Sequence, residues 1–288
     1  MKVPAYAKIN LYLDVMERRP DGFHNIRSIM HRVSLHDFVT VTKIDGECGS
    51  ITVNCGDAPI PAGEGNLVWK AAKRFFEYTD IKDYSIHIDI EKHIPISAGL
   101  AGGSADAAAT LVALNSEFST DLTNDELCSI GALIGSDVPF CIAGRTTLCE
   151  GRGEILTDID AKLDLLFVIA KGGDGVSTPA AYGRIDEKFG TSLSEEFGKL
   201  DEMLGAIRNG DVKGLEGLIY NTFEEVVLPY HKEASYAKEF MLSNGATSAL
   251  LSGSGPSVFG IFSSVVAAEN VCNELKAYGY EAHVCNSL

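Results

Sequence analysis

Glycine is concentrated in one short segment that could bind phosphate. Three glycines fall within five positions at the start of GLAGGSADAAATLVALN, residues 99–115, directly before an alanine-rich run. Glycine loses the most backbone entropy on folding, so such a cluster needs a physical reason. Backbone N–H groups at a helix N-terminus attract anions, and the absence of a Cβ lets a phosphate group approach closely. The segment therefore predicts either a phosphate-binding loop or a plain turn that begins a helix.

Two nearby residues have side chains that suit a phosphate site. Ser104 would place a hydroxyl at the helix N-terminus, and Lys92 would end the preceding strand with a cation within reach. The segment matches neither the P-loop nor the dinucleotide-binding turn, whose glycine spacings differ. A second glycine-rich stretch, LLSGSGPSVFG at 250–260, is by itself typical of a hairpin connection. Two such loops in one chain favour a shared ligand.

Four other polar residues could take part in chemistry, although each has an ordinary structural explanation. Lys8 and Asn10 lie on the polar face of a predicted strand, where a solvated lysine is the simpler interpretation. Asp137, in IGSDVPF, could cap a turn, and His24, in DGFHN, could be a surface histidine. The residues taken singly leave these alternatives open.

Hydrophobic periodicity predicts the elements that would position these residues. From Ala5 to Val15 apolar and polar residues alternate, which indicates a strand with one buried face. Further strands are expected at 38–44, 51–54, 85–90, 163–170, within SALLSGSG at 248–255, and at 257–262. Helices are expected at 66–78, from the glycine-rich segment onward, at 123–134 behind a capping box, and at 267–278. Because strands and helices mix without strict alternation, we expect an α+β fold.

Length and composition narrow the class of protein. The 288 residues suffice for two domains, expected at 1–160 and 161–288. No stretch approaches 18 consecutive apolar residues, and the N-terminus lacks an apolar signal core. The seven cysteines are scattered without a CxxC pair, which favours reduced thiols in a cytoplasmic protein over disulfides or zinc. The net charge of −16 argues against nucleic acid as a main partner.

Five motifs together carry a resemblance that none carries alone. They are AKIN (7–10), DGFH (21–24), PISAGLAGGSADAA (95–108), GSDVPF (135–140) and SGSGPSVFG (252–260). Their order resembles the small-molecule kinases grouped as galactokinase, homoserine kinase, mevalonate kinase and phosphomevalonate kinase, the GHMP kinases. With EGRGE (150–154), the set looks narrower still, and resembles the branch that phosphorylates 4-diphosphocytidyl-2-C-methyl-D-erythritol in the non-mevalonate isoprenoid pathway. The resemblance runs from Pro4 to about Phe262 and is diffuse between 184 and 245.

The resemblance implies a two-domain α+β fold with ATP and substrate in the interdomain cleft. On this basis the ATP-binding residues are Asn66, Leu67, Lys92, Pro95, Gly99, Ala101, Gly102, Gly103 and Ser104. Asn66 and Leu67 would line the adenine site, and the second glycine loop would be Gly253, Ser254 and Gly255. The most glycine-rich relatives carry glycine where this chain has Ala101, so a methyl group would narrow the phosphate site slightly.

The resemblance also assigns the catalytic and substrate residues. Asp137 would accept the hydroxyl proton. Lys8 would orient Asp137 and the substrate hydroxyl and offset the charge of the γ-phosphate. His24 would recognise cytosine, with Phe23 and Tyr182 stacking on its faces. Asn10 and Thr178 would contact the methylerythritol portion, and Mg²⁺ would accompany ATP with Ser104 as a candidate ligand.

Other functions remain compatible with parts of this pattern. A homoserine or mevalonate kinase, or a related decarboxylase, would share the glycine-rich loop, whereas the DGFH motif favours a nucleobase. A nucleotide-binding sensor without catalysis would have less use for both Lys8 and Asp137. We expect a small-molecule substrate, no nucleic-acid or membrane partner, and a monomer or homodimer.

Overall fold

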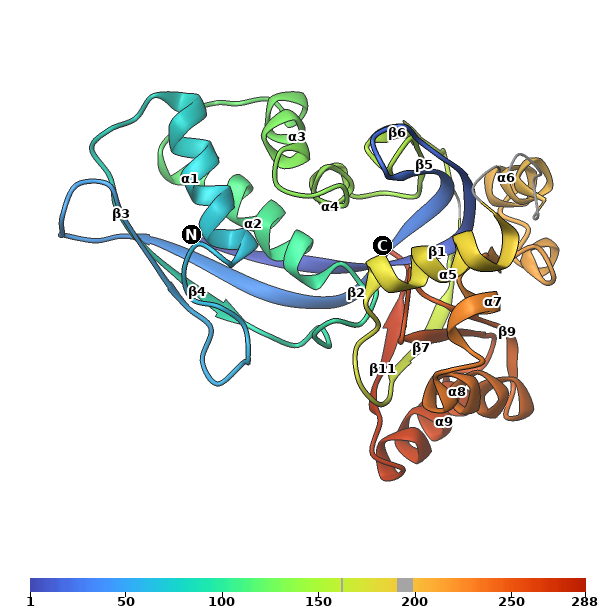
Figure 1. Cartoon of the computed structure of the whole chain (residues 1–288). Coiled ribbons are helices and arrows are strands. Elements are labelled where there is room, and N and C mark those ends of the chain that lie inside the picture. The colour runs from blue at the N-terminus through green and yellow to red at the C-terminus, as the bar shows by residue number, and fades with distance from the viewer. Residues whose placement is uncertain (162, 191–198) are drawn as a thin grey trace. The chain divides into compact units, whose positions relative to one another are not determined.

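The computed structural model describes residues 1–161, 163–190 and 199–288, and its chain divides into two compact units (Figure 1). Unit one comprises residues 1–7, 35–94 and 101–144. Unit two comprises residues 8–34, 95–100 and 145–288. These units do not coincide with the ranges 1–160 and 161–288, because the chain passes repeatedly from one unit to the other. The assignment of ATP binding to 1–160 stays a prediction.

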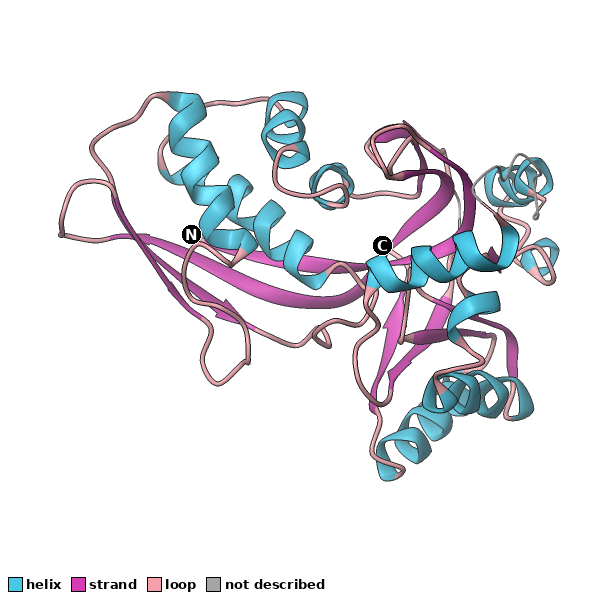
Figure 2. Ribbon diagram, in the orientation of Figure 1, coloured by secondary structure: helices cyan, strands magenta, loops and turns pink. Residues whose placement is uncertain are grey.

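Unit one pairs a sheet with helices on one side of it (Figure 2). Its elements are the strands β3 (Ser50–Asn54) and β4 (Ser85–Glu91) and the helices α1 (Leu67–Thr79), α2 (Gly102–Glu117), α3 (Asn124–Ala132) and α4 (Val138–Ala143). Strand β3 runs parallel to β4, which pairs antiparallel with the last part of β2 (His24–Lys43). Alternate residues of β4, among them Ile86 and Ile88, are fully buried together with Phe75 of α1. The core of this unit therefore lies between strand and helix.

Unit two is built on a four-stranded antiparallel sheet of order β11-β7-β10-β9. These strands are β7 (Leu166–Lys171), β9 (Ala246–Leu251), β10 (Val258–Phe262) and β11 (Glu281–Asn286). Helices α8 (Lys232–Ser243) and α9 (Val265–Ala277) pack on this sheet (Figure 1). Its other elements are β5 (Thr147–Glu150), β6 (Ile155–Asp158), β8 (Tyr220–Asn221), α5 (Thr178–Phe189), α6 (Leu200–Asn209), α7 (Glu224–Val227) and a 3₁₀ turn at Lys213–Leu215. Val258 faces Ala170 of β7 and Leu251 of β9.

The first strand, β1 (Lys2–Arg18), corrects the expectation of one buried and one solvated face. On its supposedly polar face Asn10, Tyr12 and Asp14 are fully buried, and Lys8 is only 4% exposed. Strand β1 pairs in parallel with β8, and the ring of Tyr12 lies 5.9 Å from that of Tyr220, centroid to centroid. The alternation of apolar and polar residues correctly predicts a strand, but it does not indicate what packs on the polar face.

Several elements agree with the sequence pattern, and the α+β fold is confirmed. Helix α1 begins after Asn66, whose side chain accepts a hydrogen bond from the backbone N–H of Val68 at 2.9 Å. Helix α3 begins with both hydrogen bonds of the predicted capping box between Thr123 and Glu126. The strand expected at 38–44 is the end of a 20-residue strand, β2, and β11 was not predicted.

Candidate functional site

The two glycine-rich loops approach each other within unit two. The backbone of Gly99 has φ +76°, and a Cβ built there would lie 2.2 Å from the carbonyl oxygen of Ser252. The Ser252 hydroxyl donates to the carbonyl oxygen of Gly99 at 3.1 Å, and the Ser257 N–H donates to that of Ala98 at 3.2 Å. Only glycine fits at position 99, because the φ angle and the close backbone contact both exclude a side chain.

Lys8 and Asn10 belong to the same part of unit two. The Lys8 backbone N–H donates to the carbonyl oxygen of Leu100 at 3.1 Å, and its Nζ donates to Oδ1 of Asn10 at 2.7 Å. The amide of Asn10 donates in turn to the Ser28 hydroxyl at 2.7 Å. A Cβ built on Gly253 would lie 3.6 Å from Oδ1 of Asn10. The buried ammonium of Lys8 is therefore held next to both loops, where an anion would benefit from its charge.

The second glycine loop also meets the start of α5. Gly253 and Gly255 have φ angles of +55° and +80°, which favour glycine. The hydroxyl groups of Ser254 and Thr178 are 2.7 Å apart, and Thr178 is the first residue of α5. Thr178 is thus exposed at a helix N-terminus beside the loop, as a residue that contacts a small polar ligand would be.

The glycine-rich segment begins helix α2 in unit one. Ala101 takes the N-cap position with φ +57°, a conformation that costs energy for any residue with a side chain. A Cβ on Gly102 would lie 3.4 Å from Nζ of Lys92, and one on Gly103 would lie 3.5 Å from Cδ1 of Leu67. The start of α2 therefore lies between the Lys92 ammonium and the Leu67 side chain.

Lys92 is bound by two buried carboxylates. Its Nζ donates to Oδ2 of Asp106 at 2.7 Å and to Oδ2 of Asp37, whose other oxygen accepts from the backbone N–H of Ile94 at 2.7 Å. Burial raises the pKa of Asp106 to about 7, although the Lys92 charge opposes this shift. Burial alone would lower the pKa of Lys92, but the two carboxylates outweigh it, and that pKa lies above its ordinary value. Lys92 therefore ties β2, β4 and α2 together, and its charge is balanced within the protein.

Asn66 and Leu67 occupy the first turn of α1. Besides capping the helix, Asn66 donates through Nδ2 to the carbonyl oxygen of Pro61 at 2.7 Å and contacts Sγ of Cys55 at 3.6 Å. Its amide thus holds the loop before α1. Leu67 faces the glycine-rich segment at Gly103.

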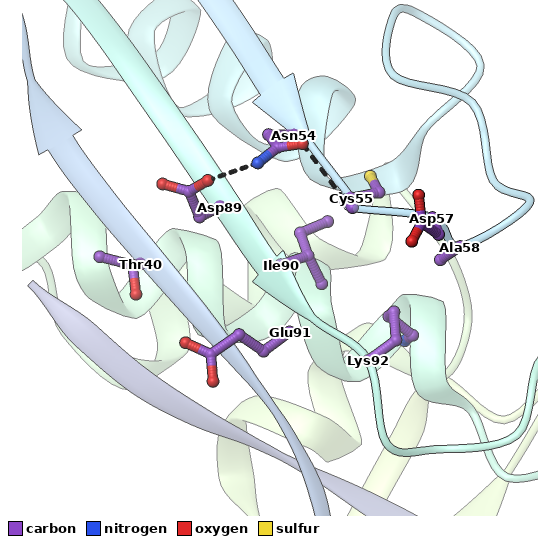
Figure 3. A pocket seen from close by; sticks show the side chains of 10 residues that line it. Thr40, Asn54, Cys55, Asp57, Ala58, Asp89, Ile90, Glu91 and Lys92 are labelled. Carbon is purple, nitrogen blue, oxygen red and sulfur yellow. Dashed lines mark hydrogen bonds between the residues drawn. The ribbon is translucent and has the colours of Figure 1, made fainter.

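A cavity of about 620 Å³ opens in unit one at the ends of β3 and β4 (Figure 3). Its walls carry polar and acidic side chains, and Cys55 connects it to Asn66. The lining residues are Thr40, Asn54, Cys55, Gly56, Asp57, Ala58, Asp89, Ile90, Glu91 and Lys92. Of the predicted ATP-binding residues, only Lys92 lines it.

Asp137 and Ser104 approach one turn of unit one from two helices. Asp137 is half-buried at the N-cap of α4 and makes no capping hydrogen bond with its side chain. A Cβ on Gly135 would lie 3.8 Å from the Ser104 hydroxyl, which places Ser104 beside the turn that carries Asp137. Among the residues that the structure describes, no three His, Cys, Asp or Glu side chains cluster as a metal site. A Mg²⁺ that accompanies ATP needs only one or two protein oxygens besides the phosphates, so these residues fit it.

His24 and Tyr182, predicted as nucleobase contacts, meet in unit two. Their rings stack at 5.0 Å between centroids with an interplanar angle of 12°. Phe23 is 56% exposed, and the Arg152 guanidinium lies 5.1 Å from its ring centroid. The structure thus brings together His24 and Tyr182, which are 158 positions apart, and leaves more than half of Phe23 exposed.

Comparisons with known proteins show the family to which this chain belongs. Residues 66–145 match the GHMP kinases N terminal domain, and residues 203–281 match the GHMP kinases C terminal domain. A 4-diphosphocytidyl-2-C-methyl-D-erythritol kinase of Clostridium botulinum (strain Eklund 17B / Type B) is 40% identical over 96% of both chains. The chain belongs to the GHMP kinases. The resemblance inferred from the motifs is confirmed, and so is the enzyme class, because GHMP kinases are small-molecule phosphotransferases that use ATP.

Further GHMP kinases match over their whole length. A 4-diphosphocytidyl-2-C-methyl-D-erythritol kinase of Exiguobacterium sibiricum is 40% identical over 99% of this chain and 97% of its own. The crystal structure of a 4-(cytidine 5'-diphospho)-2C-methyl-D-erythritol kinase superposes with a TM-score of 0.83 at 28% identity, covering 100% of this chain and 99% of that one. A homoserine kinase from Cytophaga hutchinsonii, with a TM-score of 0.73 at 20% identity over 98% and 94%, shares the fold alone.

Four residues of this GHMP kinase were not predicted, although they contact predicted ones. Asp37 and Asp106 bind Lys92, and Asp186 and Arg152 adjoin His24 and Phe23. Asp106 and Arg152 lie within the quoted motifs PISAGLAGGSADAA and EGRGE, so the sequence contained a signal for them. Asp37 and Asp186 carry no local signal, because their partners are distant in sequence.

None of the helices in the described part of the chain has the length and apolar character that a membrane span requires.

Proposed function

We propose that this GHMP kinase transfers the γ-phosphoryl group of ATP to the 2-hydroxyl of 4-diphosphocytidyl-2-C-methyl-D-erythritol. The products are ADP and the 2-phosphate, and the reaction belongs to the non-mevalonate route to isoprenoid precursors. Full-length relatives at about 40% identity bear the name of that kinase. The observation that carries the substrate assignment is the stack of His24 on Tyr182 beside the exposed Phe23. A planar base suits such a site better than a small hydroxy acid does.

Recognition of the base divides between stacking and hydrogen bonding. Phe23 and Tyr182 offer aromatic faces for the cytosine ring, which His24 contacts through its imidazole. Phe23 has no polar group on its ring, so it contributes stacking alone. Asn10 and Thr178 contact the methylerythritol portion, since Asn10 adjoins Gly253 and Thr178 adjoins Ser254.

The phosphates of ATP bind at the glycine-rich segment that begins α2. Gly102 and Gly103 leave the backbone open there, and the unpaired N–H groups of the first turn attract negative charge. Lys92, bound to Asp106 and Asp37, positions this segment rather than contributing a free cation.

Phosphoryl transfer needs alignment, charge neutralisation and a proton acceptor. Asp137 accepts the proton of the attacking hydroxyl, which contributes roughly 10²–10⁴-fold for a positioned general base. Lys8 orients the hydroxyl and offsets the charge of the transferred group, with its ammonium held by Asn10 at 2.7 Å. Lys8 belongs to unit two and Asp137 to unit one, so their joint action is part of the proposal.

Mg²⁺ accompanies ATP and neutralises phosphate charge. The Ser104 hydroxyl, in the first turn of α2, is the candidate protein oxygen for it.

Each of the seven cysteines is a free thiol, which supports a cytoplasmic enzyme.

A coupled assay of ADP release with Mg-ATP tests this function. Four acceptors are offered side by side: the cytidyl compound, its uncytidylated 4-phosphate, homoserine and mevalonate. Turnover with the cytidyl compound alone is expected. Turnover with homoserine or mevalonate instead would keep the kinase and refute the substrate, and ATP binding without turnover would favour a sensor.

The Asp137→Asn variant tests the proton acceptor in the same assay. It is expected to fold like the wild type and to lower kcat by at least about 10²-fold, because the amide cannot accept the proton. An unchanged melting temperature controls for folding. Near-normal turnover by this variant would remove Asp137 from the role of base.

A further inference from the structure

Asp186 has no part in the function proposed so far, yet it contacts the histidine that is to bind the base. Its Oδ1 lies 2.8 Å from Nε2 of His24, and its Oδ2 lies 3.4 Å from the Arg18 guanidinium. Asp186 and Tyr182 are four residues apart on α5, so they project from the same face of the helix. Helix α5 therefore presents a carboxylate and an aromatic ring to one imidazole.

The carboxylate determines which imidazole nitrogen carries the proton. An ionised carboxylate only accepts hydrogen bonds, so Nε2 of His24 is the donor in this contact. In a neutral imidazole Nδ1 is then an unprotonated acceptor. Among the described residues, none forms a hydrogen bond with Nδ1 of His24. With the His24 side chain only 3% exposed and one ring face on Tyr182, Nδ1 is the polar atom left for a ligand.

We propose that Asp186 selects cytosine over uracil by holding His24 in the tautomer that is protonated on Nε2. Cytosine carries an amino donor at the position where uracil carries a carbonyl acceptor. An unprotonated Nδ1 accepts from the cytosine amino group, whereas uracil would set acceptor against acceptor. Asp186 is thus a positioning residue that acts through His24, and Arg18 offsets its charge. The inference rests on the proposed function in one respect, namely that His24 faces the base.

The kinetic test compares two acceptors that differ only in the base. The kcat/KM values for 4-diphosphocytidyl-2-C-methyl-D-erythritol and its uridine analogue are measured for the wild type, D186N, D186E and E187Q. D186E keeps a carboxylate within reach of His24. E187Q is the matched control, because Glu187 is the next residue of α5, is exposed and loses the same charge.

The wild type is expected to prefer the cytidyl compound by about 10²-fold or more, as a site built around one hydrogen-bonding pattern does. D186N should lower that preference by at least about tenfold, the magnitude of a hydrogen bond to a charged group, because asparagine can also donate to Nε2. D186E should retain most of the preference, and E187Q all of it. A D186N enzyme with the wild-type preference would overturn the inference.

A second measurement needs no substitution of Asp186. The ¹⁵N chemical shifts of the wild-type imidazoles, with the signal missing from H24Q taken as that of His24, report which nitrogen is protonated. Protonation on Nε2 alone is expected, and protonation on Nδ1 would overturn the inference even if D186N failed to fold.

The two proposals fail in distinguishable ways. If the wild type phosphorylates neither nucleotide compound, the proposed function is wrong, whatever the tautomer of His24. If it phosphorylates both with similar kcat/KM, the function survives and the selection by Asp186 is wrong.

Discussion

The two lysines that the sequence singled out have contrasting environments. Lys92, in unit one, donates to the carboxylates of Asp37 and Asp106. Lys8, in unit two, is only 4% exposed and donates to the neutral amide oxygen of Asn10. A cation between two carboxylates fixes the elements that carry them, whereas the hydrogen bond from Lys8 to Asn10 goes to a neutral acceptor. Residue type alone therefore does not distinguish a lysine that links structural elements from one that we propose acts in catalysis.

The first prediction concerns Lys8. Lys8→Met should lower kcat by about 10²–10³-fold, the usual result of removing one preorganised donor to the developing charge, because methionine keeps the chain length and loses the ammonium. Steady-state kinetics with saturating Mg-ATP measure it. A wild-type kcat in this variant would break the contrast between the two lysines.

The sequence predicts the residues within its motifs better than it predicts the residues that contact them. The motifs identify Lys8, Lys92 and His24, and periodicity finds most of the elements that carry them. The partners are missed where they come from distant segments: Asp37 lies 55 residues from Lys92, and Asp186 lies 162 residues from His24. The burial of Lys8 is missed because the alternation along β1 does not indicate what packs on its second face.

The second prediction concerns stability at Lys92. Lys92→Met leaves two carboxylates buried without their cation, which should lower the free energy of unfolding by about 3–5 kcal/mol. Urea unfolding at pH 8 measures it. Lys2→Met is the matched control, since its ion pair with Glu91 is exposed and should contribute at most about 1 kcal/mol. Equal losses in both variants would show that the buried cluster is no more important than a surface ion pair.

Gly99 and Gly103, the first and last glycines of the cluster, separate an effect on folding from an effect on ATP binding. Gly99→Ala should destabilise the fold by about 2 kcal/mol or more, because its Cβ would meet the Ser252 carbonyl at 2.2 Å in a left-handed conformation. Gly103→Val should destabilise the fold less than Gly99→Ala, since a Cβ there meets Leu67 at an ordinary 3.5 Å, but it should raise the KM for ATP. Thermal melts and ATP titrations separate the two effects. An unaltered ATP affinity in Gly103→Val would count against phosphate binding at this turn.

The last prediction concerns the pH dependence of stability that Asp106 causes. Burial raises its pKa from 3.8 to about 7. Between these two pH values the carboxyl group is protonated in the folded state and ionised in the unfolded state. This group therefore stabilises the fold less as the pH rises from about 4 to 7. Asp106→Asn removes that dependence, and its stability relative to the wild type should increase between pH 5 and pH 8. Urea unfolding at both values measures it, and a constant difference would contradict the raised pKa.

The most direct test of the account is to identify the product. The enzyme is incubated with Mg-ATP and 4-diphosphocytidyl-2-C-methyl-D-erythritol, and ³¹P NMR follows the phosphorus atoms. We expect one new phosphomonoester, coupled to carbon 2 of the methylerythritol unit, in an amount equal to the ADP formed. A phosphate on another hydroxyl, or ADP without a new ester, would contradict the proposed function.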